Sequence, residues 1–180
     1  MPKPVRVLKS REVYHGRVIQ VKVDSIVEPG GVRAEREVVH HAGSVVVLAR
    51  TPDGRVVLVR QYRYPAGESL WELTAGGLEP GEKPLAAARR ELLEETGYRA
   101  GRCRLLCSFF PSPGILTEKM YLVEATQLTQ SIAQPESDER IEVGHFTPAA
   151  LMKMIESRRI RDGKTLVGLM WLLLKVSSSN

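Results

Sequence analysis

Three glutamates near the end of one predicted helix carry the most distinctive chemistry of the sequence. The segment 83–96 is predicted to be helical, and Glu91, Glu94 and Glu95 share one face of it because they are spaced i, i+3 and i+4. Gly97 is predicted to end the helix. The helix dipole is negative at that end, so each carboxylate there is unfavourable by about 0.3–1 kcal/mol. The cluster therefore needs a cation.

Two kinds of cation could offset the three carboxylates. Arg89 and Arg90 lie in the same helix, and salt bridges to them would make the cluster a solvated helix end. The alternative is a divalent metal ion, because Mg²⁺ binds carboxylate oxygens and keeps water and substrate phosphates as its other ligands. The segment 75–82 favours the metal, since it is a loop with three glycines that leads into the helix, and glycine lets the backbone approach a ligand closely.

Loop and helix together resemble the signature motif of the Nudix hydrolase superfamily. The fixed positions of that motif are occupied by Gly76, Glu82, Arg90, Glu91, Leu92, Glu94, Glu95 and Gly97. Tyr98 stands where the family usually has an aliphatic residue. A chance match has a probability of about one in a hundred million per starting position. The resemblance implies metal-dependent hydrolysis of the pyrophosphate bond of a nucleoside diphosphate derivative.

The resemblance also implies roles for the residues of the motif. The expected ligands of Mg²⁺ or Mn²⁺ are the carbonyl of Ala75 and the carboxylates of Glu91, Glu94 and Glu95. Glu82 and Arg90 are expected to brace the loop against the helix by a salt bridge, and Gly76 and Gly97 to serve its structure. The metal would offset the charge of the phosphates and orient the attacking water.

A general base for that water is expected in a late acidic segment. Glu136, Asp138, Glu139 and Glu142 crowd the region before Val143. Glu139 is the predicted base, acting beside Glu91 and Glu94, because an Asp-Glu pair stands before a short strand there, as in the ADP-ribose pyrophosphatase branch of the family. An ordinary acidic solvent loop is the alternative.

Three further segments resemble that branch, which hydrolyses ADP-ribose to AMP and ribose 5-phosphate. They are residues 60–63, 71–73 and 110–118, and the segment 162–165 is also similar. Thr74 departs from the branch, which usually has proline there. The resemblance implies substrate contacts by Arg36, Arg63, Glu72 and Glu118, each of which could instead be a surface charge.

Two other functions remain open. The same scaffold serves other nucleoside diphosphate sugars such as GDP-mannose. A Nudix domain that binds a ligand without turnover is the alternative from a different class. All carboxylates of the motif are present, which favours an enzyme.

The flanking sequence predicts an α/β (α+β) fold, implied by the family to be a mixed β-sheet sandwiched between helices, with a small N-terminal antiparallel β-sheet. Three β segments are predicted before residue 41, and further strands at 44–50, 55–62, 71–75, 104–110, 119–125 and 140–146. The segment 51–54 has the composition of a hairpin turn. Two helices are predicted to close the chain, one after Thr147-Pro148 and one at about 164–176. We expect residues 1–40 to be a module for a homodimer and residues 41–180 to be the catalytic domain.

Composition limits the other classes of function. The net charge of +5 comes from scattered Lys and Arg residues, which does not favour nucleic-acid binding. No apolar run is long enough for a membrane span, and no secretory signal is predicted, so a cytoplasmic location is expected. Cys103 and Cys107 are predicted to be small buried hydrophobes on the same face of a strand.

Overall fold

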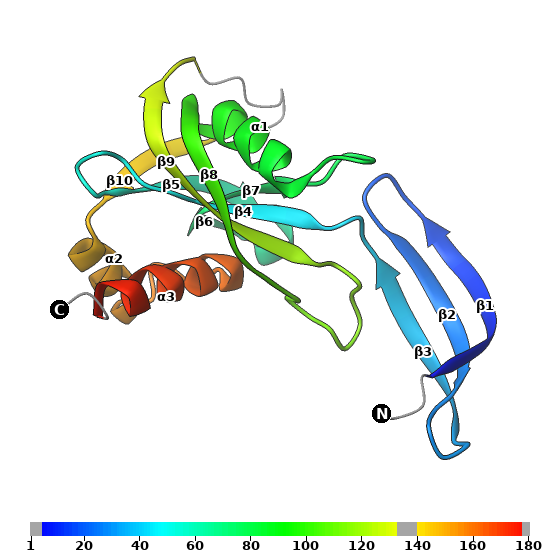
Figure 1. Cartoon of the computed structure of the whole chain (residues 1–180). Helices are drawn as coiled ribbons and strands as arrows, with labels where there is room; N and C mark the ends of the chain where they lie inside the picture. Colours follow the sequence, from blue (N-terminus) through cyan, green and yellow to red (C-terminus); the bar gives the residue numbers. More distant parts are fainter. Residues whose placement is uncertain (1–4, 133–139, 178–180) are drawn as a thin grey trace. The chain divides into compact units, whose positions relative to one another are not determined.

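A computed structural model describes residues 5–132 and 140–177 of the chain (Figure 1). It divides into two compact units, Met1–Gly43 with Phe110–Lys119 and Ser44–Phe109 with Met120–Asn180. None of the described helices is long and apolar enough to cross a membrane.

The first unit is built on an antiparallel sheet of β1 (Arg6–His15), β2 (Gln20–Val27) and β3 (Arg33–His40), in that order. The three strands predicted before residue 41 are thus confirmed. The segment 110–119 joins the unit through a parallel bridge from Val39 to Leu116, and the Val39 N–H donates to the Ile115 carbonyl at 2.8 Å. A late segment of the chain therefore belongs to the N-terminal unit, which the sequence did not indicate.

The second unit contains two sheets. One has the order β7-β4-β9-β8, formed by Thr74–Gly77, Ser44–Ala49, Met120–Gln130 and Tyr98–Phe109, and β4 and β9 in it are parallel. The other has the order β10-β5-β6, formed by Glu142–Phe146, Val56–Arg63 and Glu68–Glu72. A short 3-10 helix, Tyr64–Ala66, separates β5 from β6. The mixed α+β class is confirmed.

Two local predictions about these strands are wrong. The turn at 51–54 forms, but β4 and β5 belong to different sheets and only the Arg50–Val56 bridge joins them, so they make no hairpin. The strand predicted at 71–75 is two strands, β6 and β7, which also belong to different sheets. The chain changes sheets at Leu73, and short-range patterns do not report which neighbour a strand will pair with.

The helices begin and end where their capping residues predict. Helix α1 (Pro84–Thr96) starts with proline and ends at Gly97, whose φ of 74° is the left-handed conformation that glycine accepts most readily. Helix α2 (Pro148–Glu156) starts at Thr147, whose hydroxyl accepts a hydrogen bond from the Ala150 N–H at 3.2 Å. Helix α3 (Gly163–Ser177) closes the described chain.

The core of the second unit lies on both faces of the β7-β4-β9-β8 sheet. Every residue of β4 is buried. One face packs Val45, Val47 and Val123 with the apolar side of α1, and the other packs Val46 and Leu122 with α2 and α3. Figure 1 shows α1 on one side of this sheet and α3 on the other. The acidic helix therefore has an apolar side that anchors it to the sheet.

The prediction that the two cysteines lie on the same face of a strand is wrong. Cys103 packs in the α1 layer and Cys107 in the α3 layer, so they lie on opposite faces of β8. The cause is a bulge between Leu105 and Cys107, which adds a residue and reverses the alternation of the strand. Both thiols are partly buried, and burial raises the pKa of each.

Candidate active site

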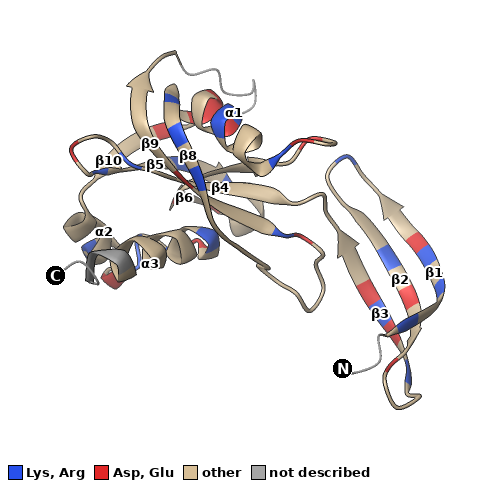
Figure 2. Ribbon diagram, viewed as in Figure 1, with Lys and Arg blue, Asp and Glu red and all other residues tan. Residues whose placement is uncertain are grey.

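Helix α1 presents the three glutamates at graded depths. Glu95 is 4% exposed. The Glu91 side chain is 13% exposed and that of Glu94 is 35% exposed. The predicted cluster thus runs from the interior to the surface at the end of one helix. In the ribbon of Figure 2, acidic and basic residues lie close together along α1.

The Glu91 carboxylate lies directly over strand β7. A Cβ atom built on Gly76 would come within 2.0 Å of this carboxylate, so no other residue fits at that position without displacement. In β7, Gly76 pairs with Val45 and the preceding Ala75 pairs with Val46. The glycine of the motif therefore allows a helix carboxylate to reach the backbone of the strand.

Arg90 joins the loop to the helix. Its guanidinium donates to both carboxylate oxygens of Glu82, at 3.1 and 2.9 Å, and to the Gly77 carbonyl at 3.0 Å. The hydrogen bond to Glu82 is the main cause that raises the pKa of Arg90, and the same contact lowers the pKa of Glu82. The expected pair is thus formed in the structure.

The same guanidinium also contacts the acidic cluster. It donates to Glu91 at 2.7 Å and to Glu94 at 3.1 Å. Arg89, the other candidate cation, instead donates to the Ala100 carbonyl. Arg90 thus shares one positive charge among the carboxylates of Glu82, Glu91 and Glu94.

These residues fit a divalent cation by the chemistry of their donors. Carboxylates beside a glycine-rich strand are oxygen ligands of the kind that hard cations take, and Gly76 leaves the Glu91 carboxylate room against the β7 backbone. The side chains of the described residues do not form a ready-made three-ligand group. Arg90 holds Glu91 and Glu94, so a bound metal must exchange with those two contacts.

A second ionic group lies at the end of strand β5. Arg63 donates to both carboxylate oxygens of Glu72, at 3.0 and 2.8 Å, and Glu72 is only 1% exposed. Lys164 bonds the same carboxylate at 2.5 Å and Asp162 at 2.9 Å. The hydrogen bond to Glu72 raises the pKa of Arg63, and the charges of Glu72, Glu95 and Asp162 act in the same direction. This network therefore lies within electrostatic reach of the acidic cluster.

The start of α3 closes this network against the glycine-rich strand. Asp162 accepts hydrogen bonds from the Thr165 N–H at 2.9 Å and from its hydroxyl at 2.6 Å. The Thr165 hydroxyl, which is fully buried, accepts from the Leu73 N–H at 2.8 Å. The segment 162–165 resembles the ADP-ribose pyrophosphatase branch in sequence, but no role was predicted for it. The signal was an Asp placed as a helix cap before Gly-Lys-Thr.

The other predicted residues lie elsewhere. Arg36, on β3, forms an exposed ion pair with Glu28. Glu118 belongs to the same unit, and its carboxylate lies 3.6 Å from the His41 ring nitrogen. Glu142, exposed on β10, pairs with Arg60 at 3.4 Å. The predicted base Glu139, with Glu136 and Asp138, lies outside the described residues.

Comparison with known proteins places this geometry in a family. The model of the NUDIX domain matches residues 40–166. The chain belongs to the Nudix family. It is a Nudix hydrolase, as the motif predicted. Helix α1, which carries the acidic cluster, is the helix of the Nudix motif. Nudix hydrolases generally use a divalent metal ion.

Two relatives match this Nudix hydrolase over nearly its whole length. An ADP-ribose pyrophosphatase of Bacillus subtilis (strain 168) is 36% identical over 94% of this chain and 93% of its own. A methanol dehydrogenase activator of Bacillus methanolicus is 37% identical over the same shares. A GDP-mannose pyrophosphatase of Escherichia coli (strain K12) is 33% identical over 78% of each chain.

The Nudix fold is also found in a solved structure. A crystal structure of an ADP compounds hydrolase superposes with a TM-score of 0.87 at 20% identity, covering 100% of this chain and 98% of that one. At this identity the match supports the fold alone. The predicted Nudix fold is thereby confirmed.

Proposed function

We propose that this Nudix hydrolase cleaves ADP-ribose to AMP and ribose 5-phosphate with Mg²⁺ or Mn²⁺. The observation that carries the proposal is the match over nearly the full length to an ADP-ribose pyrophosphatase, including the N-terminal unit outside the family domain. The complete acidic face of α1 supports catalysis rather than ligand binding alone.

The residues of the site would have different roles, which follow from their burial and charge. Glu91, Glu94, Glu95 and the Ala75 carbonyl would hold the metal, which when bound offsets the charge of the diphosphate and activates water. Glu82 fixes Arg90, and Arg90 fixes the loop at Gly77. Arg63 is held in place by Glu72 and could donate to a phosphate with the edge of its guanidinium that Glu72 leaves open. Glu139 remains the proposed general base.

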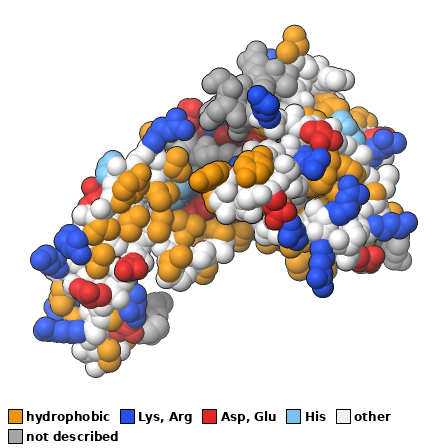
Figure 3. Space-filling view, turned by 180° about the vertical axis from the view of Figure 1, so that it is seen from behind, with side chains coloured by type: hydrophobic (Ala, Val, Ile, Leu, Met, Phe, Trp, Pro, Cys, Tyr) orange, Lys and Arg blue, Asp and Glu red, His pale blue; other side chains and the backbone are white. Residues whose placement is uncertain are grey.

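We also propose that the protein is a homodimer formed through the N-terminal unit. Figure 3 shows hydrophobic side chains gathered on one face of this unit. The exposed apolar residues of the unit include Val7, Leu8, Val13, Tyr14, Val18, Val32 and Ile115. A contiguous apolar surface favours association. In such a dimer Arg36 and Glu118 would contact the substrate. Sedimentation should give a dimer at micromolar concentration, and a fully active monomer would contradict this.

Location and other partners are proposed on composition. The chain has scattered basic residues and two reduced cysteines. We propose a cytoplasmic enzyme that acts on small nucleotides and not on nucleic acid.

Another nucleoside diphosphate sugar is the second candidate substrate. The relative from Escherichia coli whose name is GDP-mannose pyrophosphatase favours it. That relative covers a smaller share of the chain than the ADP-ribose pyrophosphatase does, so ADP-ribose is preferred.

Product analysis tests the proposal. The purified protein is incubated with ADP-ribose or GDP-mannose, with Mg²⁺ or with EDTA. We expect AMP and ribose 5-phosphate only with metal. Cleavage of GDP-mannose alone would overturn the substrate, and no cleavage in either metal arm would favour a ligand-binding Nudix domain.

A further inference from the structure

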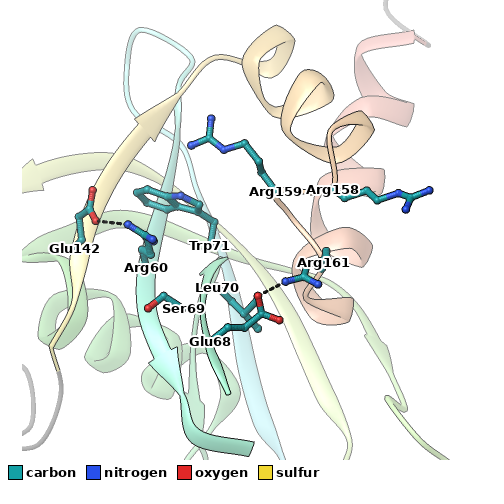
Figure 4. A pocket seen from close by; sticks show the side chains of 9 residues that line it. All are labelled: Arg60, Glu68, Ser69, Leu70, Trp71, Glu142, Arg158, Arg159 and Arg161. Atoms are coloured by element: carbon teal, nitrogen blue, oxygen red, sulfur yellow. Dashed lines mark hydrogen bonds and ion pairs between the residues drawn. The ribbon is translucent and has the colours of Figure 1, made fainter. Parts of the chain in front are cut away.

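A cavity lies among strands β5, β6 and β10 and the connection between α2 and α3 (Figure 4). Its volume is about 370 Å³, within the range of pockets for small ligands. It shares no lining residue with the acidic cluster or with the Arg63–Glu72 network. Its chemistry must therefore be considered separately.

The lining of this cavity is strongly basic. Four arginines and two glutamates line it. Arg60 pairs with Glu142 at 3.4 Å, and Arg161 pairs with Glu68. Arg158 and Arg159 form no ion pair with any residue that the structure describes, so two positive charges are left over. Arginine binds phosphate oxygens with two parallel hydrogen bonds, which makes such a surplus typical of an anion site.

The backbone at Arg158 ends helix α2 beside the cavity. The N–H of Arg158 donates to Ile155 and that of Arg159 donates to Met154, the two hydrogen bonds of a Schellman helix end. Arg158 has a φ of 59° at the position where this motif usually has glycine. This helix end sets where the chain turns from α2 into the segment that carries Arg158, Arg159 and Arg161.

Trp71 forms a rigid wall of the cavity. Its ring packs edge-on against Phe146, with centroids 5.0 Å apart, and its Cη2 lies 2.8 Å from the place of a Cβ on Gly144. Figure 4 shows Arg60 beside this indole and Arg159 extending toward it, whereas Arg158 points to the other side. An anion held by Arg159 would therefore change the surroundings of the indole, which makes binding observable.

We propose that this cavity is a second anion-binding site that takes the phosphate group of a small phosphorylated compound. Arg159 binds the phosphate, and the Arg60–Glu142 and Arg161–Glu68 pairs form the walls. The site requires neither the metal nor turnover, so the proposal is independent of the proposed hydrolysis.

The test uses the fluorescence of Trp71 in a Trp171→Phe background, since the chain has only two tryptophans. Inorganic phosphate and AMP are titrated in EDTA, with sodium chloride at matched ionic strength as the blank. We expect a saturable change with both phosphates and none with chloride. A lower half-saturation for AMP would assign the site to nucleotides, and equal values would assign it to free phosphate.

Variants locate the binding. Arg159→Gln should weaken binding about tenfold or more, the effect of losing one charge-assisted hydrogen bond. Arg102→Gln, an exposed arginine on β8 outside the cavity, is the matched control and should leave binding unchanged. Absence of saturation, an unchanged titration in Arg159→Gln, or loss of the signal in Arg63→Gln instead would overturn the proposal.

Discussion

The hydroxyl of Thr165 accepts a hydrogen bond from the backbone N–H of Leu73 at the residue where the chain passes from one sheet to the other. Leu73 lies between β6 and β7, and outside both ladders its N–H has this partner. Thr165 opens α3, so the end of the chain secures the strand that carries Ala75 and Gly76. The two residues are 92 positions apart in sequence.

Thr165→Val should lower both stability and metal affinity. The change keeps the shape of the side chain but leaves the Leu73 N–H buried without an acceptor, which costs about 1–3 kcal/mol of unfolding free energy. Urea unfolding and titration with Mn²⁺ measure the two effects. Thr165→Ser keeps the hydroxyl and should stay close to the wild type in both. Equal behaviour of the two variants would show that the hydrogen bond has no influence.

Glu95→Gln should cut turnover by orders of magnitude without lowering the melting temperature. The substitution removes the charge of a proposed metal ligand whose side chain is 4% exposed, and it keeps nearly the same shape. It also relieves repulsion at the negative end of α1. Steady-state kinetics and thermal unfolding measure the two quantities. A variant that melts much earlier would mean that Glu95 mainly stabilises the fold.

Gly76→Ala should abolish activity, whereas Gly77→Ala should retain it. The added methyl would meet the Glu91 carboxylate at 2.0 Å in the first case and nothing within 4 Å in the second. Each variant adds one methyl group, so comparing the two tests whether the close approach of Glu91 to β7 is required. Mn²⁺ affinity and kcat are the measurements, and equal losses in both variants would contradict the steric reason.

The stabilisation that Glu82 gives the folded protein should be lost as the pH falls. Arg90 lowers the pKa of this carboxyl below its usual 4.5, so the folded state binds the proton less readily than the unfolded state. The stabilisation is present above pH 4.5 and is lost as the pH falls through the folded value. When urea unfolding is measured from pH 7 to pH 3, the free energy of unfolding should fall less steeply with acid in Glu82→Gln than in the wild type. Glu79→Gln is the control, because Glu79 is in the same loop but 68% exposed.

The sequence predicted best what is encoded locally. The caps Pro84 and Gly97 fixed the bounds of α1, and the spacing of Glu91, Glu94 and Glu95 fixed their common face. The pairing of strands that are distant in the sequence was harder to predict. The shift of the chain between sheets at Leu73 and the bulge before Cys107 depend on strand partners that no short pattern specifies.

The same limit applies to the candidate site. The Arg90–Glu82 pair follows from a known motif, but the additional bonds of Arg90 to Glu91 and Glu94 emerged only in three dimensions. Lys164 and Thr165 reach Glu72 and Leu73 from the far end of the sequence. Their partners could not be read from spacing, because contacts over such separations depend on how the whole sheet is assembled.

The two cysteines, separated by the bulge in β8, provide a natural pair of reporters. Cys103 faces the layer under α1 and Cys107 the layer under α3, and both thiols are partly buried, so opening of either layer should speed the labelling of its own thiol. The rates of labelling at the two positions would show whether the catalytic helix detaches from the sheet before, after or together with the C-terminal helices. Substrate and metal should then slow labelling of Cys103 more than that of Cys107, without any change to the sequence.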